Sequence, residues 1–397
     1  MQDKKKFYKI LDNKNFQVKV FKPFNKLCIE FLEDFSKELK TYKNLKSHPD
    51  LIYLMFWSSK EKIKKLEKDH KDNKHRLGRG LIFHICPSNV PTNFVYSLFF
   101  GLLSGNSNII KISSENSKEK SIIINILNNI FKKPKYKVLK NSNILTEYKT
   151  QNTENTEIFS SFCDGRVIWG GNKTINEIRK FWIPERSIDI TFADRYSMSV
   201  IDLKKLKNLS LNNLKILSKK FYYDAYSMNQ AACNSPHFVF WSGKKDKKIQ
   251  NKFWKELNNI VQDKFTFDDT HIVDKYTNLM KNIIIHDNFN KIDMYQNNLY
   301  VIDVNNKINI IDDIRGKNGT FFQKNIKNLS EIKKFISKKC QTLTYFGFEK
   351  KELEFFLLNN NLKGVDRAVA IGNALNINPI WDGFDIINEL SRIITIE

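Results

Sequence analysis

The chain has 397 residues, of which 41% are hydrophobic and 13% aromatic, and this suits a folded protein of two domains with an additional segment. Its formal net charge of +23 is typical of nucleic-acid partners, but the lysines are spread along the whole chain without an arginine-rich stripe or zinc-finger spacing. We therefore expect no nucleic-acid partner. Five cysteines without CxxC spacing exclude a disulfide framework and a structural zinc site.

The absence of a signal peptide and the short apolar runs predict a cytoplasmic protein without stable membrane insertion. The longest apolar run, 94–103, has about half the length of a membrane-spanning helix, so we expect it to be a buried helix.

Residues 1–76 predict a helical N-terminal section, in which 31–39 and 51–66 have the spacing of amphipathic helices. A doubly wound α/β domain is expected over 77–205, because short apolar runs alternate there with helical segments. Strands are expected at 81–85, 108–112, 166–169 and 199–202, and helices at 94–103, 121–131 and 174–180. The polar stretch 140–157 is expected to be a surface connection.

A second α/β domain is expected over 206–363, and 364–397 is expected to return to the first domain or to an oligomer interface. The expected elements are helices at 208–221, 243–265 and 351–358, a buried strand at 238–241, strand-like alternation over 280–325 and a strand at 341–347.

Cys233 lies in the segment QAACNSP, between a helical stretch and a buried strand. A thiolate at such a junction is a strong nucleophile toward a thioester or an aldehyde. A buried structural cysteine is the alternative.

Three further segments carry polar groups or glycine where predicted strands end. Asn89 lies between two prolines that stiffen the turn after 81–85, and its amide either donates into the crevice above the sheet or bonds its own backbone. Lys111 ends a strand and suits a ribose or phosphate, although a solvated lysine is the alternative. Gly170 and Gly171 allow a pyrophosphate to approach the backbone, but the GxGxxG pattern is absent.

Together these segments resemble the LuxC-type long-chain acyl-CoA reductases, a branch of the aldehyde dehydrogenase superfamily. The similar stretches occur in family order from about residue 77 to the C-terminus: GLIFHICPSNVP (80–91), LLSGNSNIIKISS (102–114), VIWGG (167–171), FADRYS (192–197), QAACNSP (230–236) and WDGFDIINELSR (381–392). The resemblance implies an aldehyde-dehydrogenase-like fold of two doubly wound α/β domains, one cofactor-binding and one catalytic, with a helical N-terminal section.

The resemblance also implies roles for single residues. Cys233 corresponds to the catalytic thiol, and Asn89 corresponds to the asparagine that stabilises the oxyanion together with the backbone N–H of Cys233. Lys111 corresponds to the lysine that contacts the adenosine ribose.

Four small residues complete the implied cofactor site. Ser113 and Ser114 lie near the 2′-phosphate if NADPH is the cofactor, with NADH as the alternative. Gly170 and Gly171 correspond to the cofactor-binding turn, and no metal is implied.

One departure from the superfamily pattern bears on the reaction. Ordinary aldehyde dehydrogenases carry a general-base glutamate in a Glu-Leu-Gly-Gly segment, whereas the comparable residues 194–199 here are DRYSMS. Without a base that activates water, a thioacyl group on Cys233 is reduced to the aldehyde and is not hydrolysed.

The expected function is therefore NADPH-dependent reduction of a fatty acyl thioester, with an acyl-CoA or acyl-protein donor. A cysteine-dependent acyltransferase or thioesterase without nicotinamide is the alternative. An acyl-protein synthetase and a second copy of the chain are the protein partners that the resemblance suggests.

Overall fold

The computed structural model describes residues 15–70, 72, 74–265, 267–286, 289–305, 307–308 and 311–397. The chain divides into two compact units. Unit 1 consists of the residues up to Asp194 together with Asn378–Glu397, and unit 2 consists of Arg195–Ile377. No described helix has both the length and the apolar character that crossing a membrane requires.

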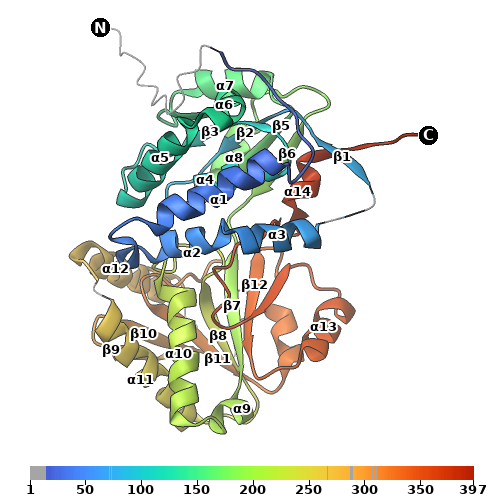
Figure 1. The fold of residues 1–397 in the computed structure, drawn as a ribbon. Helices are drawn as coiled ribbons and strands as arrows, with labels where there is room; N and C mark the ends of the chain where they lie inside the picture. Colours follow the sequence, from blue (N-terminus) through green and yellow to red (C-terminus); the bar gives the residue numbers. More distant parts are fainter. Residues whose placement is uncertain are drawn as a thin grey trace. The chain divides into compact units, whose positions relative to one another are not determined.

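Unit 1 is built around a five-stranded parallel sheet with the strand order β4-β3-β2-β5-β6 (Figure 1). The strands of unit 1, including those outside this sheet, are β1 (His75–Gly78), β2 (Leu81–Ile85), β3 (Ser107–Ile112), β4 (Asn143–Glu147), β5 (Gly165–Trp169), β6 (Ile188–Phe192), β14 (Ile380–Trp381), β15 (Phe384–Asp385) and β16 (Ser391–Ile394). Its α-helices are α1 (Lys26–Lys40), α2 (Pro49–Trp57), α3 (Lys60–Asp69), α4 (Asn93–Leu103), α5 (Lys118–Phe131), α6 (Lys137–Asn141), α7 (Thr153–Ser161), α8 (Asn172–Ile178) and α14 (Ile386–Glu389).

The centre of unit 1 follows from its apolar runs. Every residue of β2, β3, β5 and α4 is buried, as expected for strands and a crossover helix enclosed on both sides. From β2 the chain proceeds outward to β3 and β4 and then returns to β5 on the other side. The carboxyl ends of β2 and β5 therefore form the point where the strand order reverses, which is the usual place for a ligand.

Two predictions for unit 1 are wrong. The expected single helix over 51–66 is two helices, because Ser58 bonds back to Leu54 and Ser59 caps the start of α3. The expected surface connection over 140–157 contains β4, whose Asn143 side chain is buried and donates to the carbonyl of Leu139 at 2.7 Å. Its polar sequence concealed the strand.

Unit 2 contains a seven-stranded sheet with the order β13-β12-β7-β8-β11-β10-β9, in which only the pair β9–β10 is antiparallel among the described strands. The strands are β7 (Tyr196–Asp202), β8 (Pro236–Ser242), β9 (Phe289–Tyr295), β10 (Leu299–Val304), β11 (Thr320–Ile326), β12 (Cys340–Phe346) and β13 (Arg367–Ala370). The α-helices are α9 (Leu203–Lys207), α10 (Leu211–Tyr226), α11 (Lys247–Lys264), α12 (Asp269–Ile285) and α13 (Lys350–Asn359).

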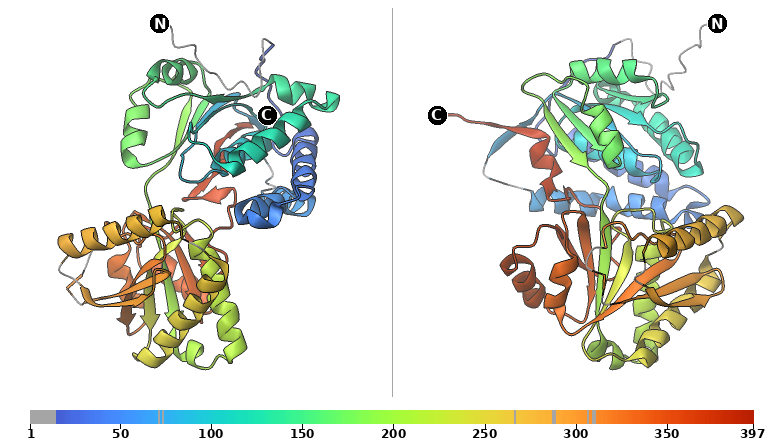
Figure 2. Two further views of the ribbon diagram at one scale, coloured as in Figure 1. Left: turned by 90° about the vertical axis from the view of Figure 1, so that its left-hand side faces the viewer. Right: turned by 180° about the vertical axis from the view of Figure 1, so that it is seen from behind.

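Helices cover both faces of this sheet, as the alternation along β8 shows. Phe238 and Phe240 join a core that includes residues of α12 and α13, whereas Val239 and Trp241 join the core under α10 and α11. Figures 1 and 2 show α10 and α11 together on one face of the sheet. The expected strand pattern over 280–325 is wrong in its first part, because α12 extends to Ile285.

Candidate active site

Cys233 lies in the loop that connects the end of α10 to the start of β8. This loop is at the amino edge of the parallel sheet, where Ser197 of β7 and Pro236 of β8 are register partners. All five cysteines lie in the described part of the chain, and four of them are buried, whereas Cys233 is partly exposed. Burial raises the pKa of Cys28, Cys86 and Cys163 to about 12, so these thiols stay protonated at neutral pH.

Gln230, three residues before Cys233, fixes the loop from inside. Its side chain is 3% exposed, and its Oε1 accepts the N–H groups of Gly319 (2.8 Å) and Thr320 (3.1 Å). Its Nε2 donates to the carbonyls of Pro236 (3.2 Å) and Thr320 (3.1 Å). Gln230 has a positive φ of 57°, so these four bonds hold a turn that the backbone does not favour.

Asn234, which follows Cys233 directly, fixes the other side of the loop. Its buried amide donates to the carbonyl of Ala374 at 2.5 Å, and Arg367 Nη1 donates to the same carbonyl at 2.6 Å. Ala374 in turn donates its N–H to Asp224 Oδ1 at 2.9 Å, and the other carboxylate oxygen of Asp224 accepts the N–H of Gly372 at 2.6 Å. The Cys233 loop, Asp224, Arg367 and residues 372–374 are thus one hydrogen-bonded assembly, which we call the clamp.

Ser197 holds the backbone of the cysteine itself. Its hydroxyl donates to the carbonyl of Cys233 at 2.7 Å and accepts the N–H of Thr342 at 3.1 Å. Ser197 belongs to the 194–199 stretch that lacks the glutamate of ordinary aldehyde dehydrogenases. That stretch therefore contributes to positioning the cysteine.

Neither histidine near the predicted catalytic residues is suited to act as a base. Burial, followed by the nearby Arg315 guanidinium, lowers the pKa of His237 to about 4, and its Nδ1 lies 2.7 Å from the carbonyl of Gly316. Burial lowers the pKa of His84 to about 4, and its ring nitrogens bond Ser97 (2.7 Å) and Asn108 (3.0 Å). The interpretation of His84 as a satisfied core histidine is confirmed.

Asn89 lies in unit 1, in the turn that links the carboxyl end of β2 to α4. The Asn89 side chain is exposed, although Cys86 and Thr92 on either side of the turn are buried. The turn starts next to β3, because the N–H of Cys86 donates to the carbonyl of Lys111 at 3.1 Å. Asn89 and Lys111 therefore belong to one edge of one sheet, whereas Cys233 belongs to unit 2.

Lys111 is the register partner of Ile85 and is only 7% exposed. Its ammonium group lies 5.2 Å from the centre of the Tyr148 ring, at the end of the next strand. Burial lowers the pKa of Lys111, and a negatively charged ligand would favour its charged form. A solvated lysine, the alternative open from the sequence, is excluded.

Ser113 and Ser114 follow β3 in a loop that Lys120 fixes. Lys120 Nζ donates to the carbonyls of Ser113 (2.7 Å) and Glu115 (3.0 Å) and to the Glu147 carboxylate (2.8 Å). Ser114 is exposed, and Ser113 is half-buried with its hydroxyl accepting the N–H of Glu115 at 3.1 Å.

Gly170 and Gly171 connect β5 to α8 on the other side of β2. A Cβ added to Gly171 would meet no atom within 4 Å, so packing within the described chain does not require this glycine. A Cβ on Gly170 would lie 3.2 Å from Thr174. With Lys111 and the two serines, this open backbone suits the phosphate and ribose groups of a dinucleotide. The residues present therefore fit a nicotinamide cofactor.

Sequence reasoning missed the residues that hold the site in place. Gln230, Asn234 and Ser197 were quoted as parts of motifs without a role, and Asp224 and Lys120 were not singled out. The signal for Gln230 and Asn234 is their polarity: two amides flank a cysteine in a segment that leads into a buried strand, and buried amides need partners.

Comparison with known proteins identifies the family of the chain. Residues 6–393 match the acyl-CoA reductase (LuxC) family. A long-chain acyl-protein thioester reductase of Vibrio harveyi is 24% identical over 199 residues, and the match covers 48% of this chain and 39% of that protein.

Solved structures show the same fold. An oxidoreductase from Marinobacter aquaeolei has a TM-score of 0.65 at 10% identity, covering 95% of this chain and 87% of that one. Aldehyde dehydrogenase 21 from Physcomitrella patens has a TM-score of 0.63 at 9% identity, covering 97% and 86%. The expected fold class, an aldehyde-dehydrogenase-like α/β fold, is confirmed by these structures, and the match over residues 6–393 shows that the chain belongs to the acyl-CoA reductase (LuxC) family.

Proposed function

We propose that the protein reduces a long-chain acyl thioester to the aldehyde through a thioacyl group on Cys233, with NADPH as the reductant. The observation that carries this proposal is the Cys233 loop. The one cysteine that is not buried lies in a loop that Gln230, Asn234 and Ser197 hold through buried side chains. Such fixed geometry is what a nucleophile requires and what a structural thiol does not need.

The first step transfers the acyl group to the enzyme. The Cys233 thiolate attacks the carbonyl carbon, a bond from Sγ to that carbon forms, and the bond to the donor sulfur breaks. The donor leaves as a thiol once it takes up a proton. The amide of Asn89 and the backbone N–H of Cys233 are the proposed donors to the oxyanion. One such donor lowers the activation free energy by about 2.7–4 kcal/mol.

The second step returns the enzyme to its starting state. When bound, the nicotinamide supplies the hydride that reduces the acyl carbon. The bond from Cys233 Sγ to that carbon then breaks, which releases the aldehyde and regenerates the thiolate. The 194–199 stretch carries no glutamate that would activate water against the thioacyl group, and its Ser197 is engaged with backbone groups.

Lys111, Ser113 and Ser114 support NADPH as the cofactor. A 2′-phosphate carries negative charge, and a lysine with two hydroxyl groups nearby favours it over the 2′-hydroxyl of NADH. A Ser114→Glu variant is expected to shift preference toward NADH by about tenfold, since a carboxylate there would repel the phosphate. The ratio of kcat/KM for the two cofactors measures this shift.

Acyl-CoA and an acyl-protein are the donors that we propose, because the family is named for acyl-CoA reduction and the Vibrio harveyi relative for an acyl-protein thioester. An acyl-protein synthetase and a second copy of the chain remain proposed partners. We place the reaction in the cytoplasm, a reducing compartment that suits five thiols.

The two half-reactions can be separated by leaving out the nicotinamide. Mixing the enzyme with a radiolabelled C14 acyl-CoA is expected to give about one equivalent of protein-bound label and of released CoA. Addition of NADPH should then convert the label to aldehyde. Continuous CoA release without nicotinamide would identify a thioesterase and overturn the proposal. Cys233→Ala is expected to take up no label.

A further inference from the structure

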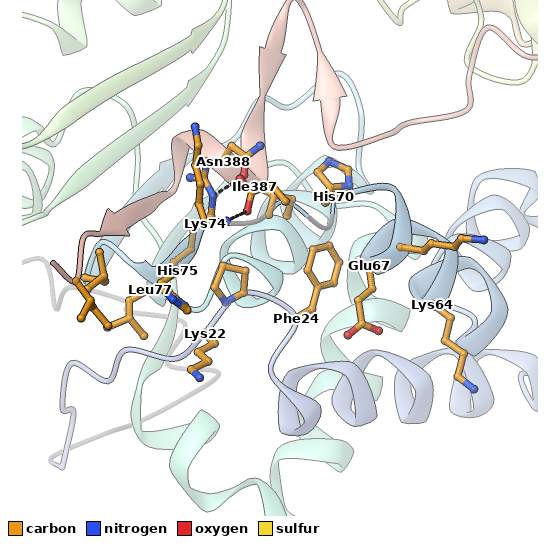
Figure 3. Close-up of a pocket in the computed structure, with 16 residues that line it drawn as sticks. Lys22, Phe24, Lys64, Glu67, His70, Lys74, His75, Leu77, Ile387 and Asn388 are labelled. Carbon is orange, nitrogen blue, oxygen red and sulfur yellow. Dashed lines mark hydrogen bonds and ion pairs between the residues drawn. The ribbon is translucent and has the colours of Figure 1, made fainter.

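Unit 1 contains a cavity of about 680 Å³ whose lining shares no residue with the predicted site. The N-terminal segment around Phe24, helix α3, strand β1 and the C-terminal elements α14 and β16 surround it (Figure 3). Its volume falls within the range of about 300–1,000 Å³ that small-molecule sites occupy. The cavity is therefore large enough for a ligand of its own.

The floor of the cavity is apolar. Phe24, Leu77 and Ile387 come from three distant parts of the chain and all line it, together with Pro23, Ile394 and Ile396. Phe24 has a positive φ of 54°, an unfavourable conformation for a bulky residue, and its N–H donates to the carbonyl of Leu103 at 2.7 Å. Its ring centre lies 6.0 Å from that of His70.

The side of the cavity formed by α3 is positively charged. Lys64 and Lys68 are one helical turn apart on this helix, whereas Lys22 of the N-terminal segment lies across Phe24 from Lys64, near Leu77 (Figure 3). Among the residues that the structure describes, none forms an ion pair with these three ammonium groups. The acidic lining residues are Glu67 and Asp72, and Asp72 Oδ2 is already bonded to Arg76 Nε at 3.0 Å.

His70 of the α3 end also lines the cavity, beside Phe24. Burial lowers its pKa, but the Asp385 carboxylate and the carbonyl of Leu66 outweigh burial, so that the pKa is raised above its usual value. His70 Nδ1 lies 2.9 Å from the carbonyl of Leu66, and Nε2 lies 3.5 Å from Asp385 Oδ1. These two neighbours therefore stabilise the protonated imidazole relative to a free histidine.

We propose that this cavity binds a single-chain anionic amphiphile, of which a fatty carboxylate is the simplest example. The carboxylate would lie at the α3 side of the cavity, by Lys64 and Lys68, and the alkyl chain would cover Phe24 and Ile387 toward Leu77. Figure 3 shows Lys64 and Leu77 on opposite sides of the cavity with Phe24 and Ile387 between them. The proposal does not depend on the reaction at Cys233.

The test measures binding of dodecanoate, below its micelle concentration, to the full chain by calorimetry. Saturable binding is expected, and shortening the ligand to octanoate should weaken it at least about tenfold, because burial of each CH₂ contributes to affinity. The double variant Lys64→Glu/Lys68→Glu should bind about tenfold more weakly than wild type.

A matched control carries the same change of charge elsewhere. Lys215→Glu/Lys219→Glu alters two exposed lysines one turn apart on α10 and should leave binding unchanged. A dodecanoate analogue with a diazirine at its chain end should label the lining residues of unit 1.

Each of the other outcomes would overturn the proposal. Equal loss of binding in both double variants would indicate a response to net charge alone. Inorganic phosphate binding as tightly as dodecanoate would indicate a simple anion site. Binding to phosphatidylglycerol vesicles without binding of the monomeric fatty acid would indicate a membrane surface, and label confined to unit 2 would place the ligand elsewhere.

Discussion

Each unit has its own sheet, and the predicted functional residues lie at the carboxyl edge of the sheet in unit 1 and at the amino edge of the sheet in unit 2. In unit 1, Asn89 follows the carboxyl end of β2 and Lys111 lies in the last residues of β3, at the edge where doubly wound sheets ordinarily bind ligands. In unit 2, Cys233 precedes β8 and therefore lies at the amino edge.

The difference explains how each site is held. At the carboxyl edge, short turns lead into helix N-termini, whose N–H groups and partial positive charge suit phosphate groups. At the amino edge, the loop arrives from the carboxyl end of α10, which offers only carbonyl groups. Gln230, Asn234 and Asp224 are the buried side chains that supply order there.

The largest effect is expected from variants that remove the proposed function of one unit and leave that of the other intact. Cys233→Ala should lower aldehyde formation by about 10⁴-fold or more, since it removes the nucleophile, while NADPH binding stays unchanged. Lys111→Met, which keeps the buried packing, should raise the KM for NADPH about tenfold and leave acylation intact. If either variant lost both acylation and NADPH binding, the assignment of these two functions to different units would be contradicted.

Asn89 tests the contribution of unit 1 to the chemistry on unit 2. Asn89→Ala should lower kcat by about 10²–10³-fold, because it removes one donor to the oxyanion. Its exposed position predicts an unchanged melting temperature. Ser88→Ala, a change at the exposed neighbour in the same turn, is the control and should retain full activity. A normal rate in Asn89→Ala would remove this residue from the mechanism.

The fold could be predicted because its central helix and strands have continuous apolar sequences. The runs 81–85, 94–103, 108–112 and 238–241 correspond to β2, α4, β3 and β8, each fully buried. Polar elements escaped prediction: β4 is paired through backbone atoms whatever its side chains are, and the break between α2 and α3 depends on Ser58 and Ser59.

The candidate site was predictable only where a motif marks chemistry. Cys233 and Asn89 stand out by residue type and by their neighbours. Asp224 does not, because its partners Gly372 and Ala374 lie about 150 residues away and contribute backbone groups that any residue has. Long-range bonds to backbone leave no sequence pattern, so the clamp is visible only in the structure.

Gln230 tests whether the amino edge depends on buried side chains. Gln230→Ala removes four buried hydrogen bonds to the backbone of Pro236, Gly319 and Thr320, which should lower the free energy of unfolding by about 2–4 kcal/mol. Gln151→Ala removes an exposed glutamine from unit 1 and should change it by less than about 0.5 kcal/mol. Urea denaturation of both variants measures the difference, and equal values would show that Gln230 does not order the loop.

The last prediction concerns the charge of Asp224, which bonds residues 372 and 374 of the clamp. Burial raises the pKa of Asp224 from 3.8 to about 7, although two N–H groups and the Arg367 guanidinium oppose this shift. Between about pH 4 and pH 7 the folded protein then holds a proton that the unfolded chain has lost. The contribution of Asp224 to stability is therefore fully present below about pH 4 and falls as the pH rises, by about 1 kcal/mol per pH unit.

Asp224→Asn should lack this pH dependence, so that its unfolding free energy approaches or exceeds that of the wild type as the pH rises from 5 to 7. Urea unfolding at pH 5, 6, 7 and 8 measures the difference, with Asp263→Asn on the exposed face of α11 as the control. If the wild type instead becomes more stable relative to Asp224→Asn as the pH rises, the pKa of Asp224 is lowered in the folded protein and not raised. That result would mean that the N–H groups of Gly372 and Ala374 outweigh burial and that the clamp carries an ionised carboxylate. The amino edge would then hold its loop through a buried charge bonded to backbone N–H groups.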